Sequence, residues 1–124
     1  MKKLMALVAV ALTVSLPASA FAHGDKPKHG GVVQSASDLS FELVNRDGKA
    51  MIYVEDHGNS MPTAGASGKL TVLTGGEKSE LALEPSAPNA MSTKENAKLV
   101  KGSKAIASIS FADKKVVNVR FSIN

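Results

Sequence analysis

Three histidines are the side chains of this sequence best suited to bind a metal ion: His23, His29 and His57. Imidazole nitrogen is a good ligand for copper, zinc and nickel. The sequence contains no cysteine, which excludes disulfides, thiolate metal sites and thiol catalysis. A metal site in this chain would therefore depend on the histidines, together with nearby carboxylates and amines.

His23 follows a segment that has the pattern of an export signal. Two lysines precede an apolar run from Leu4 to Leu16, and small residues then predict a cut after Ala20 or Ala22. As a helix, the apolar run would span about 20 Å, which is short of the roughly 30 Å hydrocarbon core of a bilayer. We therefore predict a cleaved signal helix, export to the periplasm and no stable membrane anchor after processing.

Either cut would leave a nitrogen chelate at the new amino terminus. After Ala22, the α-amine and the imidazole of His23 can close a chelate on one ion. After Ala20, His23 is the third residue, and the amine, two backbone amides and the imidazole form a square-planar set for Cu(II) or Ni(II). Binding by either route should weaken as pH falls, because the amine has a pKa of about 8. The alternative is that a terminal histidine is only a polar residue and binds nothing.

His29 lies in a polar segment without hydrophobic periodicity, which predicts a flexible arm over residues 23–31. The arm also contains Asp25, and Gly30 with Gly31 would let it fold back. Two imidazoles, a carboxylate and an amine are enough donors for a copper or zinc ion. The alternative is a solvated linker in which histidine has no ligand.

His57 follows Asp56 at the end of a predicted strand and opens a loop, where binding residues are often found. Asp56 could bind a metal itself or orient the histidine, and Met61 could offer a thioether. The structural alternative is that Asp56 and His57 cap a turn through side-chain hydrogen bonds while Met61 fills the edge of the core. The sequence leaves both alternatives open.

The elements that must position these histidines are almost all strands. Apolar and polar residues alternate at 39–43, 107–111 and 117–123, and shorter strands are predicted at 51–55, 70–73 and 81–83. Asp47-Gly48, Gly75-Gly76 and 113–115 are turn signals between them. Short strands at this spacing predict an all-β fold over residues 32–124, a small antiparallel β-sandwich that is Ig-like or barrel-like.

Three segments carry weaker signals. Residues 56–68 are rich in glycine, proline and serine, which predicts a long irregular connection. Pro85 and Pro88 should end the strand before them and open a second loop. Residues 92–100 fit a short helix or a strand equally well.

Composition excludes several classes of function. The formal charge of +4 includes two lysines of the signal, which leaves about +2 after cleavage. With four phenylalanines, one tyrosine and no tryptophan, the chain lacks both the basic surface and the aromatic platforms of a nucleic-acid binder. No Gly-x-Ser-x-Gly motif is present, and Glu55 and Asp56 should point to opposite faces of their strand. We therefore expect no enzymatic activity and no nucleic-acid partner.

Together, the predicted His23 terminus, the Asp56-His57 pair and the strand pattern resemble periplasmic copper carriers of the CopC type. These are small β-sandwiches whose mature chain begins with a ligating histidine. The segment HGGVVQSASDLSFELV with the later YVEDHG also looks like small uncharacterised exported proteins of proteobacteria, which imply no activity. The arrangement that resembles these carriers is one Cu(II) site, in which the arm returns across the sandwich so that His23 and its amine meet His57 and Asp56.

The function we expect is Cu(II) buffering or delivery in the periplasm, with zinc and nickel as less favoured metals. The predicted ligands are His23, His29, Asp56 and His57, and the expected partner besides the metal ion is an envelope metal-transport or efflux protein. The alternative is a metal-free envelope module that contacts a partner through a sheet edge or the loop at 56–68.

Overall fold

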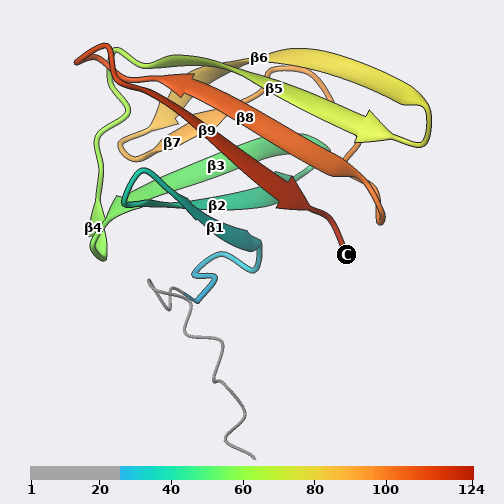
Figure 1. Ribbon diagram of the computed structural model, residues 1–124, viewed down its shortest axis with the longest axis horizontal. Helices are drawn as coiled ribbons and strands as arrows, with labels where there is room; N and C mark the ends of the chain where they lie inside the picture. The colour runs from blue at the N-terminus through green and yellow to red at the C-terminus, as the bar shows by residue number, and fades with distance from the viewer. Residues whose placement is uncertain (1–25) are drawn as a thin grey trace, which may run out of the picture.

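The computed structural model describes residues 26–124, so the predicted signal and His23 lie outside the described residues. This part of the chain forms nine strands (Figure 1). They are β1 (Val32–Ala36), β2 (Leu39–Arg46), β3 (Lys49–Asp56), β4 (Asn59–Ser60), β5 (Ser67–Thr74), β6 (Glu77–Ala87), β7 (Ala90–Ser92), β8 (Lys104–Ser110) and β9 (Val116–Ser122). Among residues 26–124, no helix is long and apolar enough to cross a membrane.

All pairings between strands are antiparallel, in the order β1-β2-β3-β7-β6-β5-β8-β9, with β4 added to the end of β3. β6 joins the two halves of the sheet, because its first part pairs with β5 and its last part with β7. The sheet curls until its two outermost strands, β1 and β9, lie against each other (Figure 1). The predicted all-β fold is confirmed, in a barrel-like form of the sandwich.

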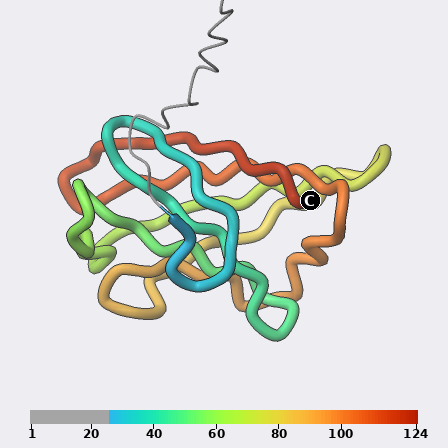
Figure 2. Tube along the Cα trace, turned by 90° about the horizontal axis from the view of Figure 1, so that it is seen from below, coloured from blue at the N-terminus to red at the C-terminus, as the bar shows by residue number. Residues whose placement is uncertain are grey.

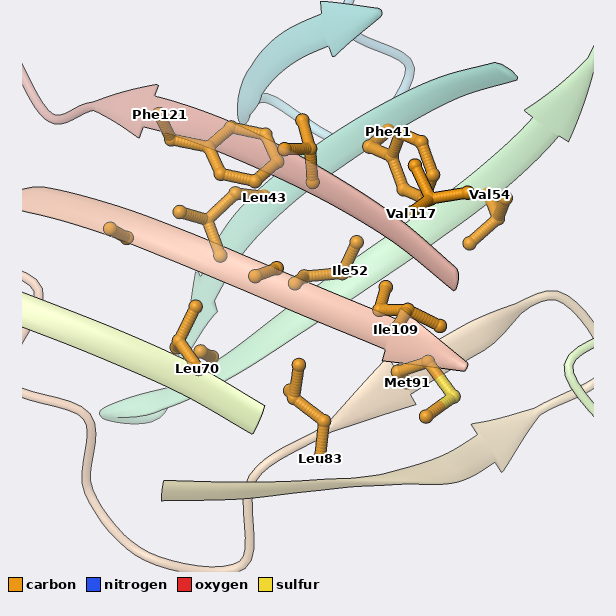
Figure 3. Close-up of a cluster of buried hydrophobic side chains, with 14 of the residues drawn as sticks. Phe41, Leu43, Ile52, Val54, Leu70, Leu83, Met91, Ile109, Val117 and Phe121 are labelled. Carbon is orange, nitrogen blue, oxygen red and sulfur yellow. The ribbon is translucent and has the colours of Figure 1, made fainter. Parts of the chain in front are cut away.

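The core lies between the curled halves of the sheet and follows the period-two alternation of the strands. Phe41 and Ile52 come from β2 and β3, whereas Leu70, Ile109 and Phe121 come from β5, β8 and β9 (Figure 3). Each of these side chains is at most 2% exposed. The apolar residues of the alternation at 107–111 and 117–123 therefore face the core. The predicted last hairpin is present as β8 and β9.

The tight turns have the backbone that their sequences demand. Asp47 and Gly48 both have positive φ, at 54° and 85°, which is the requirement of a type I′ hairpin between β2 and β3. Gly75 has a φ of 61° between β5 and β6. The predicted hairpins at these two positions are confirmed.

Other segments depart from the sequence predictions. Residues 56–68 are not one irregular loop, because β4 turns back on β3 and pairs Asn59 with Asp56. β6 does not end before Pro85 but continues to Ala87, with a register shift between these two residues. A proline is tolerated there because an irregular pairing does not need its missing N–H. Residues 93–103 are neither helix nor strand, and β1 is a strand that the sequence had not predicted.

β2 is buried on both faces, whereas its alternation had predicted a half-buried strand. Phe41 and Leu43 face the core, and yet Ser40 and Glu42 on the opposite face are each only 6% exposed. The chain that precedes β1 covers this second face, as the contacts described below show. A charged side chain buried on the outer face of a sheet marks the place where a site can be built.

Candidate metal-binding site

The carboxylate of Glu42 is the centre of the candidate site. Three backbone N–H groups donate to it: those of Lys28 at 3.0 Å, His29 at 2.8 Å and Gly31 at 2.9 Å. The backbone of the arm, predicted to be flexible, is thus hydrogen-bonded to the outer face of β2 over residues 28–31. Figure 2 shows this blue segment beside the hairpin of β1 and β2. Hydrogen bonds to a charged acceptor are stronger than ordinary ones, so this is a specific anchor.

The ring of His29 makes a fourth hydrogen bond to the same carboxylate. Its Nδ1 lies 2.9 Å from Oε1 of Glu42. Because an ionised carboxylate only accepts, Nδ1 must carry the proton, and in the neutral ring Nε2 then has a free lone pair. Within residues 26–124 no hydrogen bond engages Nε2. A carboxylate that holds one ring nitrogen while the other is available is the usual support of a histidine metal ligand.

The ring of Tyr53 packs on the flat face of the same imidazole. Its ring is stacked on that of His29, with centroids 3.7 Å apart and planes 4° from parallel. Tyr53 on β3 is the cross-strand partner of Glu42 on β2, so the pairing register projects both side chains onto one face. The side chain of His29 is 35% exposed, which leaves it accessible while two neighbours set its orientation.

Lys28 attaches the arm to the sheet at a second point, beside the hydrogen bonds to Glu42. Its Nζ lies 2.5 Å from Oε2 of Glu55, which is two residues beyond Tyr53 on the same face of β3. The lysine side chain is 55% exposed and that of Glu55 18%, so solvent screens much of this ion pair. The buried Glu42 therefore anchors the arm, and the Lys28 pair is secondary.

The electrostatics of Glu42 favour the charged form. Burial by itself would raise the pKa of Glu42, but the hydrogen bonds from the His29 ring and from three backbone N–H groups outweigh it and lower the pKa. The carboxylate is thus ionised at neutral pH and polarises the ring of His29.

This lowered pKa predicts that docking of the arm is lost in acid. Because the folded pKa lies below the unfolded value of about 4.3, the stabilisation is complete above that value. It disappears as pH falls through the lower, folded pKa. We expect the near-ultraviolet circular dichroism of Tyr53, the only tyrosine in the sequence, to change in this acid range. The variant Glu42→Gln cannot titrate, and an equal transition in it would contradict the assignment.

Gly31 lets the arm approach β2 closely. A Cβ atom at this position would lie 2.2 Å from the carbonyl oxygen of Leu43 and 2.8 Å from Cγ2 of Val44. Both distances are too short for any side chain, and the first atom belongs to the backbone of a buried strand. Glycine at position 31 is therefore a condition for the docked arm.

Asp56 and His57 form a separate pair in the turn between β3 and β4. His57 and Gly58 have positive φ, at 50° and 85°, which is the backbone of a type I′ turn. Nδ1 of His57 lies 2.5 Å from Oδ1 of Asp56, and both side chains are more than half exposed. This contact fits both alternatives, a pair within the turn and an aspartate that orients a histidine ligand. Met61 packs against the core, as its structural alternative predicted.

The predicted ligands therefore fall into two places. His29 is on the outer face of β2 and β3, while Asp56 and His57 are in the turn at the end of β3. Within residues 26–124, no three histidine or acidic side chains are gathered closely enough to hold a metal ion. His23 lies outside the described residues.

Sequence reasoning missed Glu42, Tyr53, Glu55 and Lys28. The alternation predicts Glu42 as a polar position of a half-buried strand, and it predicts of Glu55 only that it and Asp56 point to opposite faces. One signal was present: Ser40 and Glu42 are the polar positions of a strand that runs close after an arm with histidine and two glycines. A sequence alone does not reveal that the arm folds onto that face.

The fold and the site thus define a small antiparallel β-barrel whose amino-terminal arm is pinned by a buried carboxylate. Comparison of the chain with models of protein families found no match, and comparisons with curated proteins and with solved structures found none either.

Proposed function

We propose that the exported chain binds one Cu(II) ion through the chelate at the His23 terminus together with Nε2 of His29. The observation that carries this proposal is the hydrogen bond between His29 Nδ1 and the buried Glu42. It fixes the tautomer and leaves the second ring nitrogen as a ligand. Buffering or delivery of copper in the periplasm follows from such an accessible site.

The chain length between the two histidines allows this chelate. His29 lies six positions after His23, and an extended chain over six positions spans at most about 20 Å. The intervening Gly24 permits a return. An amine, one imidazole from each histidine and a water or carboxylate oxygen would make a tetragonal set, which Cu(II) prefers. Zinc and nickel accept the same nitrogen donors and are the less favoured metals.

The test uses exported protein whose first residue has been established by intact mass. We expect about one equivalent of Cu(II) to bind with a visible d–d band, and acetylation of the amine to weaken binding strongly. The free peptide of residues 23–31 is the matched control, because it has the same ligands without Glu42. Affinity no higher than that of the peptide would refute a role of the folded domain.

Exchanging single histidines separates the two places on the barrel. His29→Ala is expected to lower Cu(II) affinity about tenfold or more, because it removes the oriented ligand. His57→Ala should change the affinity less than about twofold, since it lies in the turn between β3 and β4 and not on the face that holds His29. Isothermal titration with a competing chelator measures both values. Equal losses in the two variants would join His57 to the site and overturn the two-place arrangement.

The partner we propose for delivery is an envelope metal-transport or efflux protein. The metal-free interaction module is the competing function, and the loop after β3 supports it because Asp56 to Ser60 are exposed. Absence of Cu(II) binding combined with capture of one envelope protein, lost when residues 57–60 are changed, would favour that alternative.

A further inference from the structure

One end of the barrel gathers segments that are distant in the sequence. The turn between β2 and β3, the connection at 93–103 and the start of β8 all lie in the right-hand half of Figure 1, where the turn between β5 and β6 reaches farthest. The N–H of Ala97 donates to the carbonyl of Gly48 at 2.8 Å, which fixes the connection against the turn. Its other end is fixed to the residue that follows β9, because the N–H of Gly102 donates to the carbonyl of Ile123 at 2.7 Å.

This end carries a concentration of exposed positive charge, which we call the basic end. Its members are Arg46, Lys49, Lys98, Lys101 and Lys104. Within the part of the chain that the structure describes, none of the five takes part in an ion pair. The acidic residues on the same segments, Asp47 and Glu95, together with Glu77 beside Lys98 and Val100, number three against these five. The five charges are thus available to an external anion.

An apolar side chain stands among these charges. Val100 is 49% exposed and lies between Lys98 and Lys101 in the sequence, whereas the neighbouring Leu99 is buried in the core. Two hydrogen bonds hold the turn that presents Val100. The N–H of Val100 donates to Oγ of Ser103 at 3.2 Å, and the carbonyl of Val100 accepts from the N–H of Ser103 at 3.0 Å. Val100 and Val116 are the two large hydrophobic side chains that are well exposed within residues 26–124.

We propose that the basic end docks on the surface of an anionic lipid bilayer, with Val100 entering the headgroup layer. Clustered lysines gain about fivefold in partitioning each from an anionic surface, and an apolar side chain amid them adds a hydrophobic contact. A fluid headgroup layer needs no complementary shape, which suits one projecting valine without a surrounding pocket. No exposed aromatic ring is present at this end to stack on bases, which disfavours single-stranded nucleic acid.

Vesicle sedimentation tests this surface. The exported chain should bind vesicles of phosphatidylglycerol and phosphatidylcholine at low salt, bind pure phosphatidylcholine weakly, and dissociate as salt is raised. The variant Lys98→Gln, Lys101→Gln, Lys104→Gln should lower the partition coefficient about a hundredfold. Val100→Ser should lower it several-fold without changing the salt dependence.

The matched control is Lys69→Gln, Lys114→Gln, Lys115→Gln, which removes the same charge from other parts of the barrel and should leave most of the binding. All variants have the same exported residues before position 26, so any contribution of that segment is constant. Melting temperatures establish that each variant is folded. An equal loss in the control, or full binding by the basic-end variant, would overturn the proposal. Equally tight, Val100-independent binding to a soluble polyanion such as duplex DNA would replace the bilayer by a phosphate polymer.

Discussion

Replacing Glu42 by glutamine is expected to lower the affinity for Cu(II) by about ten- to a hundredfold, although Glu42 is not itself a proposed ligand. The amide has nearly the shape of the carboxylate but no charge. It accepts hydrogen bonds less strongly from the arm, and it can present an N–H where His29 Nδ1 needs an acceptor. The ring would then lose both its fixed tautomer and its orientation.

The measurement is Cu(II) affinity by competition, combined with the near-ultraviolet signal of Tyr53 in the metal-free protein. Glu77→Gln is the matched control, because it removes one exposed carboxylate on β6, a strand that pairs with β5 and β7 and not with β2. A merely structural role of Glu42 would lower thermal stability without changing the affinity of the protein that remains folded. That result would remove Glu42 from the support of the site.

Substituting alanine for Gly31 is expected to release the arm while leaving the barrel folded. The added Cβ would collide with the carbonyl of Leu43, which belongs to a central strand and cannot move without breaking its ladder. Displacing the arm costs less free energy than displacing β2. We expect the Tyr53 signal to approach that of Glu42→Gln, and Cu(II) affinity to fall to about that of the free 23–31 peptide.

Gly76→Ala is a suitable control for this substitution, because a Cβ there would meet no atom within 4 Å. Hydrogen exchange of residues 28–31 provides the direct readout of docking, and protection of β2 and β8 reports on the barrel. Retained protection of the arm in Gly31→Ala would show that the close approach to Leu43 is not required. Loss of protection throughout the barrel would instead make Gly31 a residue of global stability.

Much of the fold could be predicted from local patterns. The hairpin of β8 and β9 and the turn at Asp47-Gly48 are encoded by alternation and by residues that tolerate positive φ. β1 was not predicted because its sequence, VVQSA, is short and has no clear apolar alternation. Its pairing with β2 is what makes it a strand. The prediction that Pro85 ends its strand was wrong, because the irregular pairing that accommodates this proline depends on β7.

The site was harder to predict than the fold. The histidines were visible as ligand types, and a metal near the amino terminus followed from them. The residue that organises His29 is thirteen positions away on a strand whose burial comes from the arm itself. Only tertiary contact reveals that partner. For His57, the adjacent aspartate suggested both a turn and a supported ligand, and the structure contains the turn while the ligand role stays a prediction.

The seam at which β1 meets β9 has a consequence for folding kinetics. Closing the barrel brings together strands from opposite ends of the described chain, and such long-range closure is slow. The contacts of the candidate site are short-range by comparison, because His29, Glu42, Tyr53 and Glu55 all lie within residues 28–55. The arm can therefore settle on the β2–β3 hairpin before the seam closes. A chain caught midway would already hold its histidine in place while its barrel is still open.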